Sequence, residues 1–498
     1  MKRLLAIAPG FSPVLLFILL LMSAPAVAQD FVWTQSLQRT YADLQKLKLS
    51  PNQYPLPQET LPNGVRLFID DYSDMLRLVT SDDDQLLASL GDQEDDRLDA
   101  LKKLDDTSPW KRMLMAEVRL HWAFVKLKFG KEVSASWDVI RAYRLLIDNQ
   151  KQFPTFLPTY KSLGTLHVMI GSVPENYMWV AKLLGLHGSV QQGQQELQRA
   201  QQDPIFGLEA HLVQLMVKAY VLKFNPADEK QLARLVGDHS DNLLLHFFGA
   251  TIEQKNGYSE QALHYLMERP TGKAYLPLPV IDNILGDIYL QKGEYGTAIT
   301  HFDLFLKNYK GQNFLKDSHY KLFLCRWLAN EPDVRYHSLL QKTLAVGRTT
   351  VESDKAAQKW AEAYLKKGAS PNQKALMRAR LASDGGFTDS ALAYLRPYTE
   401  ATLTSTPELA EYNYRLGRIY QRRNELDRAI PYLTRALTLS EPDQLSFGAT
   451  AALQLGYIYQ QKNDRTHARS FFQKALNFKH HEYKNSVDNK ARAGLSQL

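Results

Sequence analysis

The sequence predicts an all-α protein: a right-handed α-solenoid of helical hairpins with a less regular helical N-terminal half. Two patterns predict this fold. Apolar residues recur three and four positions apart along most of the 498 residues, and proline, glycine or asparagine separates these stretches. A set of small and bulky residues then repeats in the C-terminal half. With 45% hydrophobic and 23% charged residues, the composition excludes disordered and fibrous chains.

The first 28 residues have the pattern of a signal peptide. Lys2 and Arg3 precede an apolar stretch over residues 14–22, and Ala26-Val27-Ala28 fits the small-x-small rule for cleavage. We expect cleavage before Gln29, and the alternative is an uncleaved N-terminal anchor. Both alternatives predict an exported protein in the periplasm, either free or associated with a membrane.

Two further segments precede the repeats. Residues 29–64 predict one amphipathic helix, within residues 31–49, followed by a connector with four prolines. Residues 65–240 predict an irregular region of helical hairpins. Its expected turns lie around Pro109, Gly130, Pro154, Pro158, Gly171 and Pro204.

The stretch from Gly164 to Gly193 is the most distinctive part of this region. Gly171-Ser-Val-Pro174 predicts that one helix stops and another begins, because proline fits the first turn of a helix. Gly185 and Gly188 predict another turn before a glutamine-rich helix.

The C-terminal half repeats one steric pattern. A small residue lies midway along a first helix, glycine or asparagine occupies the turn, and the second helix carries more small residues. Small residues allow two helices to cross closely, and the turn residue tolerates left-handed backbone. Three stretches fit well: Leu285-Gly286 with Gly293, Tyr295, Ala298 and Phe302; Leu416-Gly417 with Asn424, Ala429, Leu433 and Ala436; and Leu455-Gly456 with Asn463, Ala468, Phe472 and Ala475.

Two weaker matches extend the array. One contains Ala250, Gly257, Ala262 and Leu266, and the other contains Ala379, Ala382, Gly386, Ala391 and Leu395. Together the five matches predict repeats over residues 241–480. Residues 481–498 then predict a helix that caps the last repeat.

The repeated residues resemble the tetratricopeptide repeat (TPR) superfamily. The stretch from Gly164 to Gly193, which precedes these repeats, also resembles more weakly the corresponding part of the tetratricopeptide-repeat-39 and inclusion-body-clearance family. The chain resembles equally the exported TPR proteins of Gram-negative bacteria, which suit the signal peptide better. These resemblances imply a solenoid fold and a scaffold role, with no catalytic residue to transfer.

Charge is divided unevenly along the chain. Residues 29–110 contain 16 acidic and 8 basic side chains, whereas the whole chain has a net charge of +7. The acidic runs are Asp70-Asp71, Asp82-Asp83-Asp84 and residues 92–96. They are interpreted as solvated helix ends or helix faces, since the glycine and final glutamate of a calcium loop are missing. The basic side chains are scattered among helical positions, which argues against a nucleic-acid partner.

The sequence contains no recognisable catalytic, cofactor or metal motif. It lacks His-Glu-x-x-His, Gly-x-Ser-x-Gly and a phosphate-binding glycine loop. His480-His481-Glu482 is the densest histidine group, but adjacent side chains diverge on a helix. The single cysteine, Cys325, lies among apolar residues and is interpreted as a core residue. We therefore predict a non-enzyme with no cofactor.

Seven residues on the first helices of two repeats are candidates for partner binding. They are polar or aromatic and are expected to face a concave groove: Tyr412, Asn413, Arg418, Arg422, Gln454, Tyr457 and Gln461. Arginine and tyrosine suit a peptide that carries acidic groups. The alternative is that these are ordinary hydrophilic helix positions.

Two alternative functions are consistent with the sequence. The first is an exported scaffold that binds a protein or peptide partner in its groove. The second is an enzyme or small-ligand binder with a pocket in the N-terminal half, near Trp110, Trp122, Trp137 or Trp179. We favour the scaffold because function is argued from a site and no catalytic site is visible. The identity of the partner and the oligomeric state stay open.

Overall fold

The computed structural model describes residues 30–49, 63–173, 175–333, 336–403, 405–479, 481 and 484–498. The expected signal peptide and nearly all of the proline-rich connector lie outside these residues, as does His480. The described residues form α-helices, one 3-10 turn and a single isolated antiparallel bridge between Lys48 and Tyr275, with no β-strand. The all-α prediction is therefore confirmed.

Eleven helices make up the N-terminal half of the described chain. Several begin with the signals that the sequence carries: Thr34 caps the first of them, and Asn225 and Asp228 form a capping box at the last, with Pro226 in its first turn. The helices are α2 (Gln35–Gln45), α3 (Gly64–Ser81), α4 (Asp84–Ser89), α5 (Gln93–Lys102), α6 (Pro109–Lys128), α7 (Glu132–Gln152), α8 (Thr159–Gly171), α9 (Glu175–Leu183), α10 (Val190–Ala200), α11 (Gly207–Tyr220) and α12 (Pro226–Asp238).

The distinctive glycines of this half permit a close helix crossing. A Cβ atom added to Gly164 on α8 would lie 2.9 Å from the carbonyl oxygen of Gly193 on α10. Two glycines at the crossing thus bring the two backbones together, and a larger residue at either position would separate the helices.

All five predicted repeats are helical hairpins. In three of them the small residue of the first helix lies against a large residue of the second, as Gly286 lies against Phe302. The turn residues Asn424 and Asn463 adopt positive φ angles of 60° and 59°. The hairpins pair α13 (Leu243–Asn256) with α14 (Ser259–Met267), α15 (Val280–Lys292) with α16 (Tyr295–Asn308), α20 (Pro371–Gly385) with α21 (Thr388–Leu395), α22 (Thr406–Arg422) with α23 (Leu426–Ser440), and α24 (Ser446–Gln461) with α25 (Arg465–Asn477).

Three helices that the repeat pattern did not predict lie between the second and third hairpins. They are α17 (Leu315–Leu328), α18 (His337–Ala345) and α19 (Glu352–Lys367). Cys325 lies on α17 and is fully buried, in agreement with its apolar neighbours. At the C-terminus, α26 (Lys484–Ser496) packs against the last hairpin, where Gly494 lies against Phe472.

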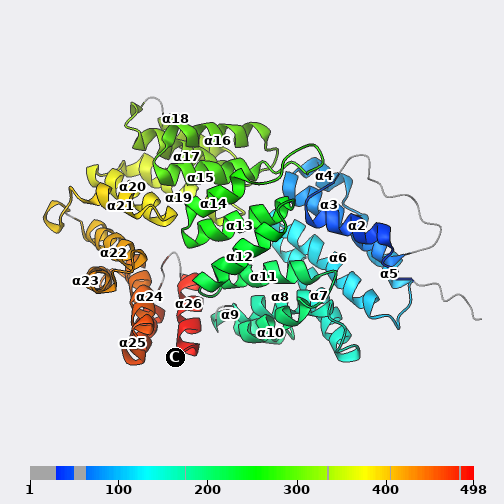
Figure 1. Cartoon of the computed structure of the whole chain (residues 1–498). Coiled ribbons are helices and arrows are strands. Elements are labelled where there is room, and N and C mark those ends of the chain that lie inside the picture. The colour runs from blue at the N-terminus through cyan, green and yellow to red at the C-terminus, as the bar shows by residue number, and fades with distance from the viewer. Residues whose placement is uncertain are drawn as a thin grey trace, which may run out of the picture.

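The chain curves so that its C-terminal helix returns to the N-terminal half. Figure 1 shows α26 in red between the α24–α25 hairpin and α9. The side-chain amide of Asn489 on α26 donates a hydrogen bond to the carbonyl oxygen of Ser172, at 3.1 Å. The first helices of the last two hairpins, α22 and α24, are thereby turned toward α11 and α13.

None of the described helices is long and apolar enough to cross a bilayer.

Candidate functional site

The face of α22 and α24 that lies toward α11 and α13 is the first candidate site, and we call it the inner face. One guanidinium nitrogen of Arg418 on α22 donates to the side-chain oxygen of Gln454 on α24, at 2.7 Å. The same nitrogen also donates to Gln421, at 2.5 Å. Arg418 therefore joins the first helices of two successive hairpins into one polar surface.

Two other predicted residues on this face contact earlier parts of the chain directly. Arg422 donates from Nη1 to the carbonyl oxygen of Gly257, at 2.8 Å, in the turn between α13 and α14. Burial, together with the charge of Arg418, lowers the pKa of Arg422 to about 10. The ammonium of Lys223 lies 4.9 Å from the ring centroid of Tyr457. Burial raises the pKa of Tyr457 to about 12.

The remaining three predicted residues lie elsewhere. The hydroxyl of Tyr412 donates to the carbonyl oxygen of Tyr398, at 2.9 Å. Asn413 is buried and donates to Glu400, at 2.9 Å. Gln461 is exposed and donates to Asn424, at 3.0 Å. Of the seven residues, four thus gather on the inner face, and a role for any of them in partner binding stays a prediction.

Three lysines that sequence reasoning missed lie near these two arginines. Lys223 follows α11, Lys255 lies at the end of α13 and Lys490 lies on α26. Burial, with the charges of Lys255 and Arg418, lowers the pKa of Lys490 to about 8. We call Lys223, Lys255, Arg418, Arg422 and Lys490 the junction cluster. Its members come from four separate parts of the chain, so no local sequence signal marks them.

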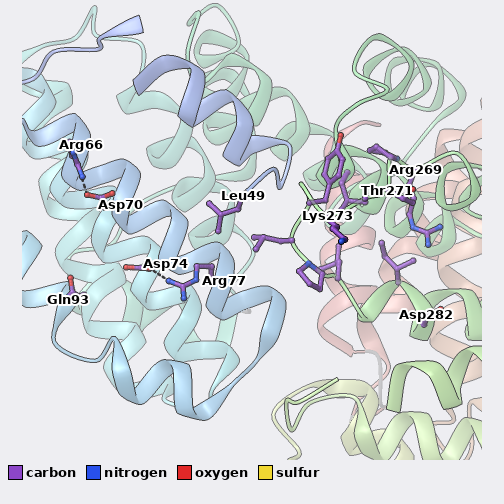
Figure 2. Close-up of a pocket in the computed structure, with 18 of the residues that line it drawn as sticks. Leu49, Arg66, Asp70, Asp74, Arg77, Gln93, Arg269, Thr271, Lys273 and Asp282 are labelled. Carbon is purple, nitrogen blue, oxygen red and sulfur yellow. Dashed lines mark hydrogen bonds and ion pairs between the residues drawn. The ribbon is translucent and has the colours of Figure 1, made fainter. Parts of the chain in front are cut away.

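A cleft of about 1280 Å³ is the second candidate site. Figure 2 shows it between α3 and the extended segment that joins α14 to α15. One wall carries Arg66, Asp70, Asp74 and Arg77, which form ion pairs along α3. The opposite wall is mainly apolar and includes the residues from Tyr275 to Leu278. The volume exceeds the usual range of a small-molecule pocket.

A buried polar network lies behind the charged wall of this cleft. Asp71 accepts hydrogen bonds from Arg97, at 3.1 Å, and from the indole of Trp122, at 2.9 Å, and lies 2.7 Å from a ring nitrogen of His121. Because Asp71 is 1% exposed, the expectation of a solvated acidic run is wrong for this residue. These bonds join α3 to α5 and α6, so the network holds the wall in place.

A second acidic residue also departs from that expectation. Asp82 is 1% exposed, and its Oδ2 accepts hydrogen bonds from the hydroxyl of Tyr309, at 2.6 Å, and the amide of Asn313, at 3.0 Å. It therefore joins the end of α3 to the segment that follows α16. The sequence could not show this pairing, because the partners are more than two hundred residues apart.

The enzyme alternative required a closed pocket near four tryptophans. None of Trp110, Trp122, Trp137 and Trp179 lines the cleft. Trp137 and Trp179 are exposed, while Trp110 packs against Phe156. Within the described ranges, no group of three or more histidine, cysteine or acidic side chains is arranged to hold a metal ion.

Comparisons with known proteins identify tetratricopeptide repeats in the C-terminal part. Family models described as tetratricopeptide repeats match residues 376–444 and 449–479. These ranges contain most of α20 and all of α21 to α23, and then most of α24 and all of α25. The TPR prediction is confirmed for these hairpins. No curated protein matches the chain.

Several solved structures show a weak likeness. Human IFIT1, solved as a dimer with PPP-AAAA, is 12% identical, with 90% of this chain and 95% of that chain covered and a TM-score of 0.31. The TPR domain of P58(IPK) is 14% identical, with 86% of this chain and 96% of that chain covered and a TM-score of 0.21.

Proposed function

We propose that the chain is an exported, non-enzymatic TPR scaffold that binds a protein partner on the inner face of its C-terminal hairpins. The observation that carries the proposal is the continuous surface of Arg418, Gln454 and Tyr457 across two successive hairpins. A guanidinium and a tyrosine are residues that often dominate binding energy at protein interfaces. The TPR matches over these hairpins support the same function.

Binding on this surface requires little rearrangement of the scaffold. Arg418 is held by Gln421 and Gln454, so its guanidinium is already placed before a partner arrives. A preformed surface lowers the entropic cost of association. An interface of standard size, about 1,600 Å² in total, then suffices for stable binding.

Site-specific photo-crosslinking tests the proposed binding face. A photoreactive amino acid replaces Gln454 on α24, and the matched control replaces the exposed Gln473 on α25 of the same hairpin. We expect discrete crosslinked species in cells from position 454 and not from position 473. Equal crosslinking from both positions, or none from position 454, would exclude the inner face.

Export rests on the first 28 residues and has its own test. The full chain is fused at its C-terminus to an alkaline phosphatase that is active only outside the cytoplasm of a Gram-negative host. We expect phosphatase activity from the full chain and none after residues 1–28 are deleted. Activity that does not depend on these residues would contradict the proposed periplasmic location.

The cleft supports a second candidate function, the binding of a ligand beside the N-terminal helices. Its volume of about 1280 Å³ and its facing charged and apolar walls favour a ligand larger than most small molecules. Lys273 extends from the loop side and Asp96 from the helix side. Under this function, a ligand of the cleft raises the melting temperature of the native chain. Lys273→Ala and Asp96→Ala should each weaken the binding of that ligand and so reduce the rise. Crosslinking from Gln454 stays unchanged in both variants.

A further inference from the structure

Five cations meet at the junction of the two halves without a carboxylate to neutralise them. Within the part of the chain that the structure describes, no acidic side chain forms an ion pair with any member of the junction cluster. Asp384 acts on Arg422 through its charge but pairs with Arg415, at 3.3 Å, and Asp488 pairs with Lys484, at 2.9 Å. The positive charge at the junction is therefore only partly compensated by the chain itself.

The cations are held close together by contacts other than ion pairs. Arg422 is anchored to the carbonyl oxygen of Gly257, and Lys223 lies over the ring of Tyr457. Lys255 lies 5.8 Å from the ring centroid of Tyr220. Carbonyl groups and aromatic faces attract cations but leave their charge uncancelled. The fold thus maintains a cationic surface that costs free energy in the absence of a ligand.

The repulsion within the cluster is visible at Lys490. This lysine is partly buried on α26, and the charges of Lys255 and Arg418 add to burial in lowering its pKa. An anion that reached these groups would relieve the repulsion and restore full protonation of Lys490.

We propose that the junction cluster is one composite anion-binding site, which takes a carboxylate-rich segment of the partner protein. The inference deepens the proposed function and rests on it for the nature of the partner. Arg418 and Arg422 are one helical turn apart, a separation at which two guanidinium groups bind neighbouring carboxylates. Lys223 and Lys255 are exposed, so an incoming segment can reach them.

The distribution of the cations favours a segment over a single small anion. The cluster is supplied by the connection after α11 and by α13, α22 and α26. A single ion would contact only the nearest of these groups, whereas successive acidic side chains would contact several at once. Binding would also join the N-terminal half to the C-terminal repeats, because the site is incomplete without both.

Fluorescence anisotropy with labelled hexaglutamate tests this site in the chain that begins at Gln29. We expect binding that weakens by about tenfold or more between about 50 mM and about 500 mM salt. Lys255→Gln and Lys490→Gln should each weaken it by about fivefold or more. The matched control is Lys474→Gln on α25, because Lys474 is exposed and lies 5.6 Å from the ring centroid of Phe471. The control should bind like the native chain.

Thermal unfolding separates loss of the site from loss of the fold. Without ligand, Lys490→Gln should melt at or above the native temperature, because repulsion is removed. Hexaglutamate should then raise the melting temperature of the native chain and of Lys474→Gln, but much less that of Lys490→Gln. Equal binding by all variants would overturn the proposal.

Four other results would also overturn all or part of it. Tripolyphosphate is offered in place of hexaglutamate, and binding of tripolyphosphate alone would assign the site to phosphate. Self-association that Lys490→Gln abolishes would assign the site to an acidic face of a second copy of the chain. If hexaglutamate does not bind but position 454 still crosslinks to a partner, the proposed function is supported and the composite anion site is contradicted. If hexaglutamate binds but no partner crosslinks at position 454, the proposed function is contradicted, and so is the assignment of the site to a segment of a partner protein.

Discussion

Arg422 on α22 donates a hydrogen bond to the carbonyl oxygen of Gly257, a residue 165 positions earlier in the chain. Gly257 has a φ angle of +78° at the end of α13, a conformation that residues with a Cβ atom rarely adopt. The bond joins the last repeats to the first predicted hairpin. Through this contact the inner face of the repeats lies beside α13 and α14.

Gly257→Ala tests this contact. The added Cβ atom costs about 1 kcal/mol or more in left-handed backbone, and it also displaces the guanidinium of Arg422. The matched control is Gly185→Ala, since Gly185 has a φ angle of +75° and open space around it. We expect Gly257→Ala to lose about 1 kcal/mol more of unfolding free energy than the control in urea denaturation. Equal losses would show that the contact with Arg422 adds no stability.

Lys161→Met should strongly destabilise the N-terminal half. Lys161 is buried and its ammonium lies 2.7 Å from Glu117 and 3.0 Å from Glu209. Burial alone would lower the pKa of Lys161, but the two carboxylates raise it above its ordinary value. Removing the lysine leaves both carboxylates buried without a cation, at a cost of about 3–5 kcal/mol in unfolding free energy.

The exposed pair of Lys102 and Asp99 provides the control for Lys161. Lys102→Met removes an ion pair of 2.6 Å on the surface of α5. Exposed pairs of this kind contribute at most about 1 kcal/mol. Comparable losses for the two variants in urea denaturation would contradict a structural role for the buried lysine.

Glu253 should make stability depend on pH. It is fully buried on α13 and neither carboxylate oxygen has a hydrogen-bond partner among the described residues. Burial, assisted by the charge of Glu229, raises the pKa of Glu253 from 4.5 to about 8. The folded chain thus retains a proton that the unfolded chain releases. The stability from this proton is complete below pH 4.5 and is lost as the pH rises to about 8.

Glu253→Gln should remove this dependence. Between pH 5 and pH 8 we expect the variant to gain about 3–4 kcal/mol of unfolding free energy relative to the native chain, at about 1.4 kcal/mol per unit of pKa shift. Denaturation at several pH values measures the slopes. Glu268→Gln serves as the control because its side chain is 61% exposed. If the unfolding free energies of the native chain and of Glu253→Gln changed with pH in parallel, Glu253 would not be the source of the pH dependence.

Neighbouring acids in one run should differ in their effect on stability. Asp82→Ala removes a buried acceptor for Tyr309 and Asn313, at an expected cost of about 2–4 kcal/mol. Asp83→Ala removes only the cap of α4, where Asp83 accepts from the amide of Gln85 at 2.8 Å, and should cost about 1 kcal/mol. Thermal denaturation of the two variants compares them, and similar losses would refute the inter-segment role of Asp82.

The helices and the repeats were predictable from local sequence. The small residue at Gly417, the turn at Asn424 and the small residues of α23 define a hairpin within about thirty residues, and the structure has that hairpin. The helices α17 to α19 lie within the predicted array of residues 241–480, but none of the five repeat matches includes them. They lack the pattern of small residues, although Asn330 after α17 has a positive φ angle of 62°. Local steric rules therefore account for the elements that follow those rules.

The candidate site was predictable only in part. Helix periodicity predicts the positions of Arg418 and Gln454, and the structure brings the two side chains together across two hairpins. Lys223, Lys255 and Lys490 carry no such signal, because each is an ordinary lysine in its own segment. The local sequence around Asp82 predicts a solvated carboxylate, because its partners lie far along the chain. What the sequence alone determined is the helical hairpin, where the interacting residues are neighbours in the chain. The tertiary structure alone decided which charges meet, because that depends on how the curvature accumulates over many hairpins.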